Sequence, residues 1–195
     1  MGSGIKTDVR GRGGFTLVEL LVVLALLGVV LAGVYQFFFF TQQSWNRASA
    51  EARVMQNARQ VLMQLDREVR QARKPNDGTQ AVVATADTLE VYTDVTGDGR
   101  PERVSYRRSG QGNQPLQRAV TASGQAGYPY TYDVPSGWVN VLDSVANSDI
   151  FTVSGTAPRL VVGVRLQVND VVWPLPQPVE VRSELTVRSR GESSD

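Results

Sequence analysis

The most distinctive pattern in the chain is a long apolar run near its beginning, from Phe15 to Phe40. The only strongly polar side chains within this run are Thr16, Glu19 and Gln36. A helix needs about 20 apolar residues to span a bilayer, and it satisfies its own backbone hydrogen bonds there. The pattern therefore predicts that this run is a membrane-spanning helix.

The helical pattern continues after the apolar run, although the chain becomes polar from Thr41. Apolar residues recur at steps of three and four, with charged residues largely between them, which indicates an amphipathic helix. The proline-containing turn at 75–78 predicts its end. We therefore expect one helix over 15–74, about 90 Å long, whose first part (15–40) lies in lipid and whose second part (41–74) packs on a head.

Strand patterns fill residues 75–190, which we expect to form the head. Segments 88–93 and 103–107 alternate apolar and polar residues on either side of a Gly-Asp-Gly turn, which predicts a hairpin. One long helix that packs on an antiparallel sheet is an α+β fold. The last residues, 191–195, are expected to be a disordered tail. The other strand candidates are 81–83, 116–120, 139–142, 150–153, 159–168 and 179–188.

Charge is arranged asymmetrically around the apolar run. Lys6, Arg10 and Arg12 precede it, and no basic residue lies inside it. Basic residues beside a spanning helix favour the cytoplasmic side, so we expect the leader to stay in the cytoplasm and the head to cross the membrane. The formal net charge of +1 predicts no bulk attraction to nucleic acid.

The composition excludes several kinds of chemistry. The chain has no Cys and no His, so a disulfide, a Cys/His zinc site and a Ser-His-Asp triad are excluded. The sequence also has no nucleophile–base motif and no phosphate-binding glycine loop. We therefore expect neither an enzyme nor a cofactor.

Glu19 is out of place in an apolar helix. A carboxylate inside hydrocarbon costs about 2.5–3.5 kcal/mol or more, so it needs a cation. No Lys or Arg lies between Phe15 and Trp45. Cleavage after Gly14 would make Phe15 a new N-terminus, and its ammonium group could pair with Glu19 of a neighbouring subunit.

The residues around this point resemble the processing site of type IV pilins and type II secretion pseudopilins. The resemblance rests on a short basic leader, a long apolar helix and, between them, the sequence Gly14-Phe15-Thr16-Leu17-Val18-Glu19. The alternative reading is an ordinary signal anchor that contains one Glu.

This resemblance implies a sequence of events as well as a fold. Prepilin peptidase would remove the leader, residues 1–14, by cutting the Gly14–Phe15 bond, and Phe15 would be N-methylated. Glu19 would pair with the N-terminus of an adjoining pilin subunit during assembly. The implied fold is the pilin fold. The implied location is the inner membrane, crossed once with the head outside, and later a cell-surface filament.

The head resembles W-type minor pilins and J-type minor pseudopilins more loosely. The points of similarity are the helix end at 65–70, the hairpin at 94–107, the strand at 115–118 and the two long terminal strands. This resemblance implies a minor subunit that initiates or caps a filament. The sequence does not distinguish a type IV pilus, a type II secretion pseudopilus and a competence filament.

The turn that begins at Asp94 partly matches a calcium loop. Asp94, Thr96 and Asp98, with Glu102 beyond them, are candidate oxygen ligands. The twelfth position of the motif, where a bidentate Glu belongs, is Ser105. The alternative is a hairpin turn whose Asp and Gly residues suit its backbone geometry.

Three residues are candidate DNA contacts, which would suit a competence pilus. Arg107 and Arg108 could contact phosphates, and Tyr130 could stack on bases, as in proteins that bind single-stranded DNA. The alternative is an ordinary charge-mixed surface, because acidic residues are interleaved. Tyrosine is favoured at interfaces, so the Tyr-rich loop over 121–137 is expected to be a subunit contact.

Overall fold

The computed structural model describes most of the chain, and the leader before Gly14 and the tail predicted at 191–195 lie outside the described residues. The chain divides into two compact units, the first of which ends at Trp45 and the second of which begins at Asn46. We call the second unit the head. The described residues are 14–76, 78–108, 110–156 and 159–188.

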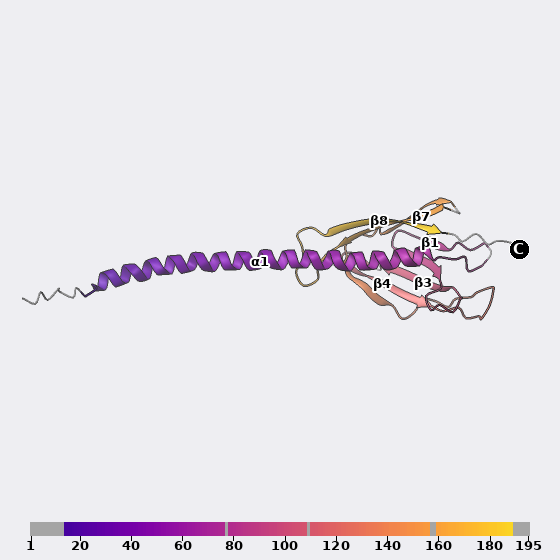
Figure 1. Cartoon of the computed structure of the whole chain (residues 1–195), viewed down its shortest axis with the longest axis horizontal. Coiled ribbons are helices and arrows are strands. Elements are labelled where there is room, and N and C mark those ends of the chain that lie inside the picture. The colour runs from indigo at the N-terminus through magenta and orange to yellow at the C-terminus, as the bar shows by residue number, and fades with distance from the viewer. Residues whose placement is uncertain (1–13, 77, 109, 157–158, 189–195) are drawn as a thin grey trace, which may run out of the picture. The chain divides into compact units, whose positions relative to one another are not determined.

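The predicted helix is present as one continuous element, α1 (Leu17–Arg70), shown in Figure 1. It ends earlier than residue 74, where the turn residues had predicted its end. The reason lies in the sheet: the N–H of Arg73 donates to the carbonyl of Tyr92 at 2.8 Å. The chain therefore leaves the helix to pair with a strand before it reaches Pro75.

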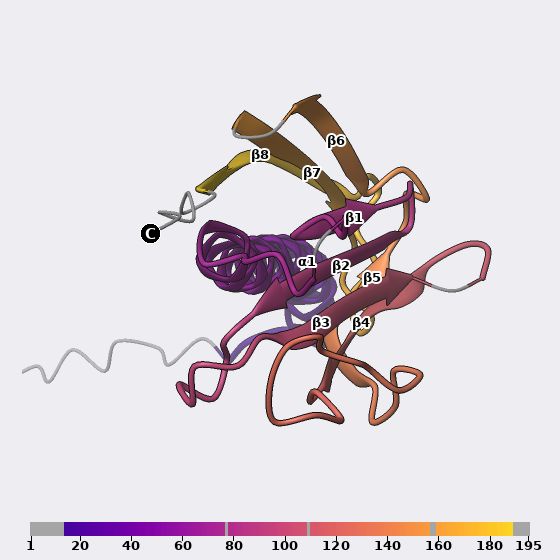
Figure 2. The ribbon, with the colours of Figure 1, turned by 90° about the vertical axis from the view of Figure 1, so that its right-hand side faces the viewer.

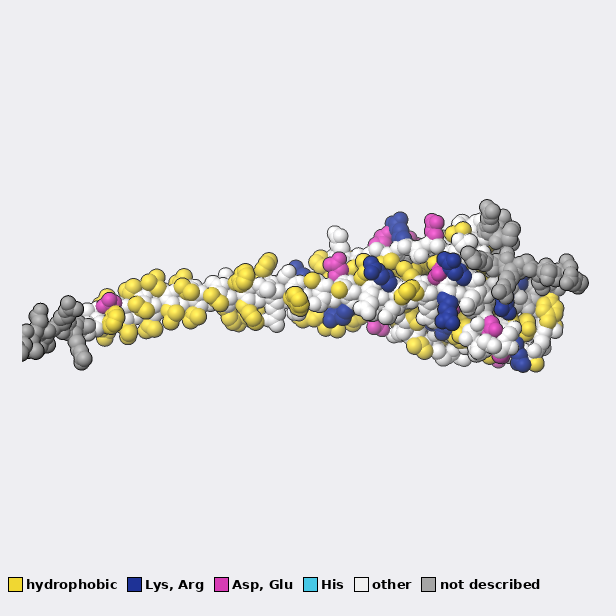
Figure 3. All heavy atoms as spheres, viewed as in Figure 1, with side chains coloured by type: hydrophobic (Ala, Val, Ile, Leu, Met, Phe, Trp, Pro, Cys, Tyr) yellow, Lys and Arg dark blue, Asp and Glu magenta, His cyan; other side chains and the backbone are white. Residues whose placement is uncertain are grey.

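The described part of the first unit is largely an apolar helix, and none of its residues is buried. α1 is long and apolar enough to cross a membrane by length and composition. Its large hydrophobic side chains are exposed from Leu17 to Phe40, and Figure 3 shows this apolar surface. These are the features expected of the predicted anchor segment, whose insertion in a membrane stays a prediction.

Antiparallel strands follow α1 in the head, as predicted. Their order in the sheet is β1-β2-β3-β4-β5-β7-β6, and β8 pairs with the other edge of β7. The structure therefore has the predicted α+β architecture, and it confirms the predicted hairpin as β2 and β3. The strands among the described residues are β1 (Val82–Ala84), β2 (Thr88–Thr93), β3 (Glu102–Arg108), β4 (Gln114–Thr121), β5 (Val139–Val145), β6 (Phe151–Thr156), β7 (Arg159–Val168) and β8 (Val179–Arg188).

β5 and β6 lie one after the other along the same edge of β7. β8 occupies the opposite edge along the whole strand, while β6 pairs with β7 up to Val164 and β5 pairs with it at Val168. Asn147, between the two strands, fills the gap in the ladder. Its side chain donates to the carbonyl of Arg165 at 2.8 Å and accepts from the N–H of Gln167 at 2.8 Å.

The core lies between α1 and the sheet. Figure 2 looks along α1 and shows β1 to β3 and β7 to β8 arranged around it. Burial on the helix begins at Ala50, so the apolar stripe starts later than predicted, and Trp45 is 74 % exposed. The α1 residues of the core are Val54, Ala58, Val61, Leu65 and Val69.

Candidate functional site

The bond predicted to be cleaved lies directly before the first turn of α1. Gly14, Phe15 and Thr16 are outside the helix, which begins at Leu17. Phe15 is 81 % exposed, and nothing lies within 4 Å of a Cβ built on Gly14. Proteolysis favours exposed backbone outside regular structure, and the Gly14–Phe15 bond meets both conditions.

Thr16 caps the helix that carries Glu19, the predicted assembly residue. The N–H of Glu19 donates to Oγ1 of Thr16 at 3.2 Å, and the N–H of Leu20 donates to the Thr16 carbonyl at 3.2 Å. The bond to Oγ1 satisfies an N–H group that the first turn of a helix leaves unpaired, and the bond to the carbonyl is the first i→i−4 bond of the helix. The cap therefore determines where α1 begins and places Glu19 in its first turn.

The Glu19 side chain stands on an otherwise apolar surface. Its neighbours Leu17, Val18, Leu20 and Leu21 are all exposed. Within the described part of the chain, no ion pair involves Glu19. A carboxylate in lipid is expensive without a cation, so this arrangement favours a partner charge from another group or another chain.

Comparison with protein-family models finds a match over this segment. Residues 9–35 match the model described as the prokaryotic N-terminal methylation motif. This chain carries the N-terminal motif of type IV pilins and pseudopilins. A protein of this class is a structural subunit that assembles with other subunits, not an enzyme. No curated protein and no solved structure matches the chain.

The head of this pilin-type chain contains a polar cluster that the sequence analysis did not identify as a site. Glu68 lies on the buried face of α1 and is 7 % exposed. Its carboxylate accepts from Tyr106 Oη at 2.7 Å and from Arg118 Nη2 at 2.7 Å. Glu68 falls three residues after Leu65 on the apolar stripe, and this spacing is the signal that could have revealed its burial.

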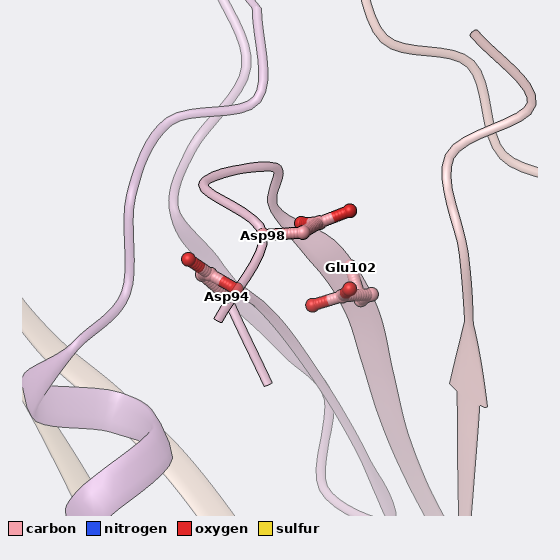
Figure 4. A group of neighbouring side chains, drawn as sticks. All are labelled: Asp94, Asp98 and Glu102. Carbon is pink, nitrogen blue, oxygen red and sulfur yellow. The ribbon is translucent and has the colours of Figure 1, made fainter. Parts of the chain in front are cut away.

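The candidate calcium ligands do come together. Carboxylate oxygens of Asp94, Asp98 and Glu102 lie within 4.8 Å of one another, and Figure 4 shows the three side chains around the turn between β2 and β3. Both Glu102 oxygens are engaged, one by the N–H of Val95 and one by the hydroxyl of Thr96, each at 2.6 Å.

The remaining carboxylates of this turn also accept backbone hydrogen bonds. Asp94 accepts from the N–H groups of Gly97 at 2.6 Å and Gly99 at 2.9 Å. Asp98 accepts from the N–H of Arg100 at 2.9 Å. Gly97 and Gly99 both have positive φ, at 82° and 86°, which glycine adopts without strain. These contacts favour the hairpin-turn reading, in which the acids stabilise the loop.

Of the three candidate DNA contacts, Arg108 is buried in the head. Arg108 is 4 % exposed, and its guanidinium donates to the carbonyls of Val145 at 3.1 Å, Gly110 at 3.1 Å and Gly112. This placement differs from the exposed phosphate contact that we expected. A buried guanidinium that is bound to three carbonyls is not available to a phosphate.

The other two candidates are also engaged within the head. The Arg107 guanidinium carbon lies 3.9 Å from the Trp138 ring centroid, a cation–π geometry. The N–H of Tyr130 donates to Asn76 Oδ1 at 2.7 Å, and the Tyr130 carbonyl accepts from Asn76 Nδ2 at 2.8 Å. The Tyr130 backbone is therefore held against the segment that follows α1.

The Tyr-rich loop folds back on the sheet. The ring centroids of Tyr132 and Tyr92 lie 5.2 Å apart. The Tyr132 hydroxyl donates to the carbonyl of Pro101 at 2.7 Å. Burial raises the pKa of Tyr132 to about 12, so its hydroxyl remains a donor at neutral pH. The contacts of Tyr132 stabilise the head itself, which reduces the part of this loop that is free to contact another subunit.

Proposed function

We propose that this chain is a minor pilin or pseudopilin subunit that is cut at the Gly14–Phe15 bond and N-methylated on Phe15. The observation that carries the proposal is the methylation-motif match over residues 9–35. The position of the scissile bond, exposed and directly ahead of α1, supports it.

In the proposed mechanism, α1 first anchors the processed chain in the inner membrane with the head outside. Cleavage creates an ammonium group on Phe15, and Glu19 supplies the matching negative charge in a neighbouring subunit. Because each group is desolvated on entering the apolar interior of a filament, pairing favours the register in which the two meet. The irregular head favours a subunit that initiates or caps the filament.

The competence-pilus alternative, in which the head contacts DNA, receives no specific support from the head. Arg108 is committed to backbone carbonyls, and Arg118 is paired with Glu68. Arg107 stacks on Trp138. We therefore keep the filament-subunit proposal as the function that the observations favour.

Intact mass of the protein from its native membrane tests this proposal. We expect a mass that lacks residues 1–14 and carries one added methyl group. A Gly14→Val variant is the matched control, because a branched side chain at the cleavage position should block processing and leave the chain at full length. A full-length mass for the unaltered protein in cells that process other prepilins would overturn the proposal.

A further inference from the structure

The loop between β7 and β8 displays three consecutive apolar residues on the surface of the head. Val171, Val172 and Trp173 are 65 %, 75 % and 45 % exposed. Single exposed apolar residues are common, but a contiguous apolar patch indicates an interaction site. We call Val171–Trp173 the apolar loop tip.

The loop backbone is held in place, so the apolar loop tip is fixed in its exposed position. Oδ1 of Asp170 accepts from the N–H groups of Val172 at 2.9 Å and Trp173 at 2.7 Å. Oδ1 of Asn169 accepts from the N–H of Leu175 at 2.7 Å. These bonds close the turn below the three side chains, which gives a preorganised surface rather than a loose segment.

The loop is tied to the part of the head where α1 enters. Oδ2 of Asp170 lies 3.3 Å from Nη2 of Arg53, and Arg53 is in the first turns of the head's portion of α1. In the same helix the apolar run ends at Phe40. The apolar loop tip therefore follows a residue that is bound to the turns of α1 with which the head begins.

The chemistry of the apolar loop tip suits a lipid headgroup region. Tryptophan is enriched at membrane–water interfaces, where its ring lies at headgroup level. The acid at the base of the tip, Asp170, is already paired with Arg53, which reduces its repulsion of an anionic surface. Arg47 and Glu51 are both exposed in the same region of α1, so their charges offset each other and do not repel an anionic surface.

We propose that the apolar loop tip rests on the membrane surface while the subunit is anchored and not yet assembled. This inference rests on the proposed function, because it requires α1 to span a membrane. The contact would hold this loop of the head against the lipid surface. Filament assembly would then have to detach Val171 and Trp173 from the headgroups.

Tryptophan quenching in lipid nanodiscs tests this contact on the full mature chain. The protein has three tryptophans, so a W45F/W138F variant leaves Trp173 as the single reporter. The nanodiscs contain phosphatidylethanolamine and phosphatidylglycerol with a nitroxide at headgroup level or at the bilayer centre. We expect the headgroup nitroxide to quench Trp173 several-fold more strongly than the central nitroxide.

Two further single-tryptophan variants separate the outcomes. Trp138 alone, packed against Arg107, should be quenched by neither lipid. Trp45 alone reports whether α1 is inserted, because it follows the apolar run. If Trp45 is quenched by lipid nitroxides and Trp173 is not, the loop inference is wrong although the anchor is correct. If neither is quenched, the anchored-subunit proposal fails as well.

Discussion

The Glu68 carboxylate of α1 and the Arg118 guanidinium of β4 are joined by two hydrogen bonds, at 2.7 and 3.1 Å. Both side chains are largely buried, with 9 % and 18 % of their surface exposed. Tyr106 completes the cluster by donating to the second carboxylate oxygen. Since these residues come from the helix and from two strands, the cluster fixes the helix in one position on the sheet.

Removing the carboxylate of this cluster should destabilise the head strongly. We expect Glu68→Ala to lower the free energy of unfolding by about 3 kcal/mol, because the Arg118 charge remains buried without a partner. The matched control is Asp66→Ala, which breaks the exposed Asp66–Arg70 pair of the same helix and should cost less than about 0.5 kcal/mol. Urea unfolding of the full chain in detergent measures both. Equal losses would contradict a special role for the cluster.

The cluster also predicts a loss of stability in alkali. Burial, and then the adjacent Glu68, raise the pKa of Tyr106 well above its usual value, whereas tyrosine in an unfolded chain ionises near pH 10. The free energy of unfolding should therefore be steady below about pH 10 and fall as the pH rises above it. Tyr106→Phe should be less stable at pH 8 and show a shallower decline.

Melting temperatures measured from pH 8 to pH 11.5 check this prediction. Some decline should persist in the variant, because burial also raises the pKa of Tyr92 and Tyr132. Parallel curves for Tyr106→Phe and the unaltered protein would show that Tyr106 does not contribute.

The Thr152 side chain on β6 leaves no room for a side chain at position 163 of β7, which is glycine. A Cβ at this position would lie 2.4 Å from Oγ1 of Thr152, the residue directly opposite. We expect Gly163→Ala to cost about 1–2 kcal/mol of stability through this overpacking. Adding Thr152→Ala should restore most of the loss. Gly127→Ala is the control, since the space around Gly127 is open, and it should change stability by less than about 0.5 kcal/mol.

Substitution of Arg108 should destabilise the head more than substitution of its sequence neighbour Arg107. Arg108→Met should lower the free energy of unfolding by about 2–4 kcal/mol, because the buried bond to the Val145 carbonyl is lost together with the bonds to Gly110 and Gly112. Arg107→Met loses the stack on Trp138 and should cost about 1 kcal/mol or less. Chemical unfolding of both variants makes the comparison. The reverse order of effects would show that Arg108 is not a structural residue.

The proposed assembly pair gives a prediction that concerns the filament rather than the fold. Glu19→Ala should be processed and methylated like the unaltered chain, yet its incorporation into filaments should fall about tenfold or more, which corresponds to about 1.4 kcal/mol. Immunoblots of sheared filaments and of membranes measure the two steps separately. Normal incorporation of Glu19→Ala would contradict pairing with the Phe15 ammonium group.

The local elements of the fold could be predicted from the sequence because their signals are local. The apolar run and the three- and four-residue steps predicted α1, and alternation predicted the β2–β3 hairpin. The two terminal strands have the predicted bounds, Arg159–Val168 and Val179–Arg188. The prolines between them limit where regular pairing can continue.

What could not be predicted depends on contacts between residues far apart in the chain. Glu68 and Arg118 meet only because the helix lies across β4, and nothing near either residue indicates this. The burial of Arg108 depends on the turn that contains Gly110 and Gly112 and on the arrival of β5. Likewise, the role of Asn147 follows from the order of the strands along β7, which local periodicity does not reveal.

The continuity of α1 has a mechanical consequence. Because the helix that carries the anchor also supplies Val54 to Val69 of the head's core, tension on the anchor would load the helix–sheet interface in shear. Under shear, the Arg53–Asp170 and Glu68–Arg118 pairs and the core contacts between them resist together instead of failing one at a time. Pulling along α1 would therefore have to break both pairs and the core contacts between them together.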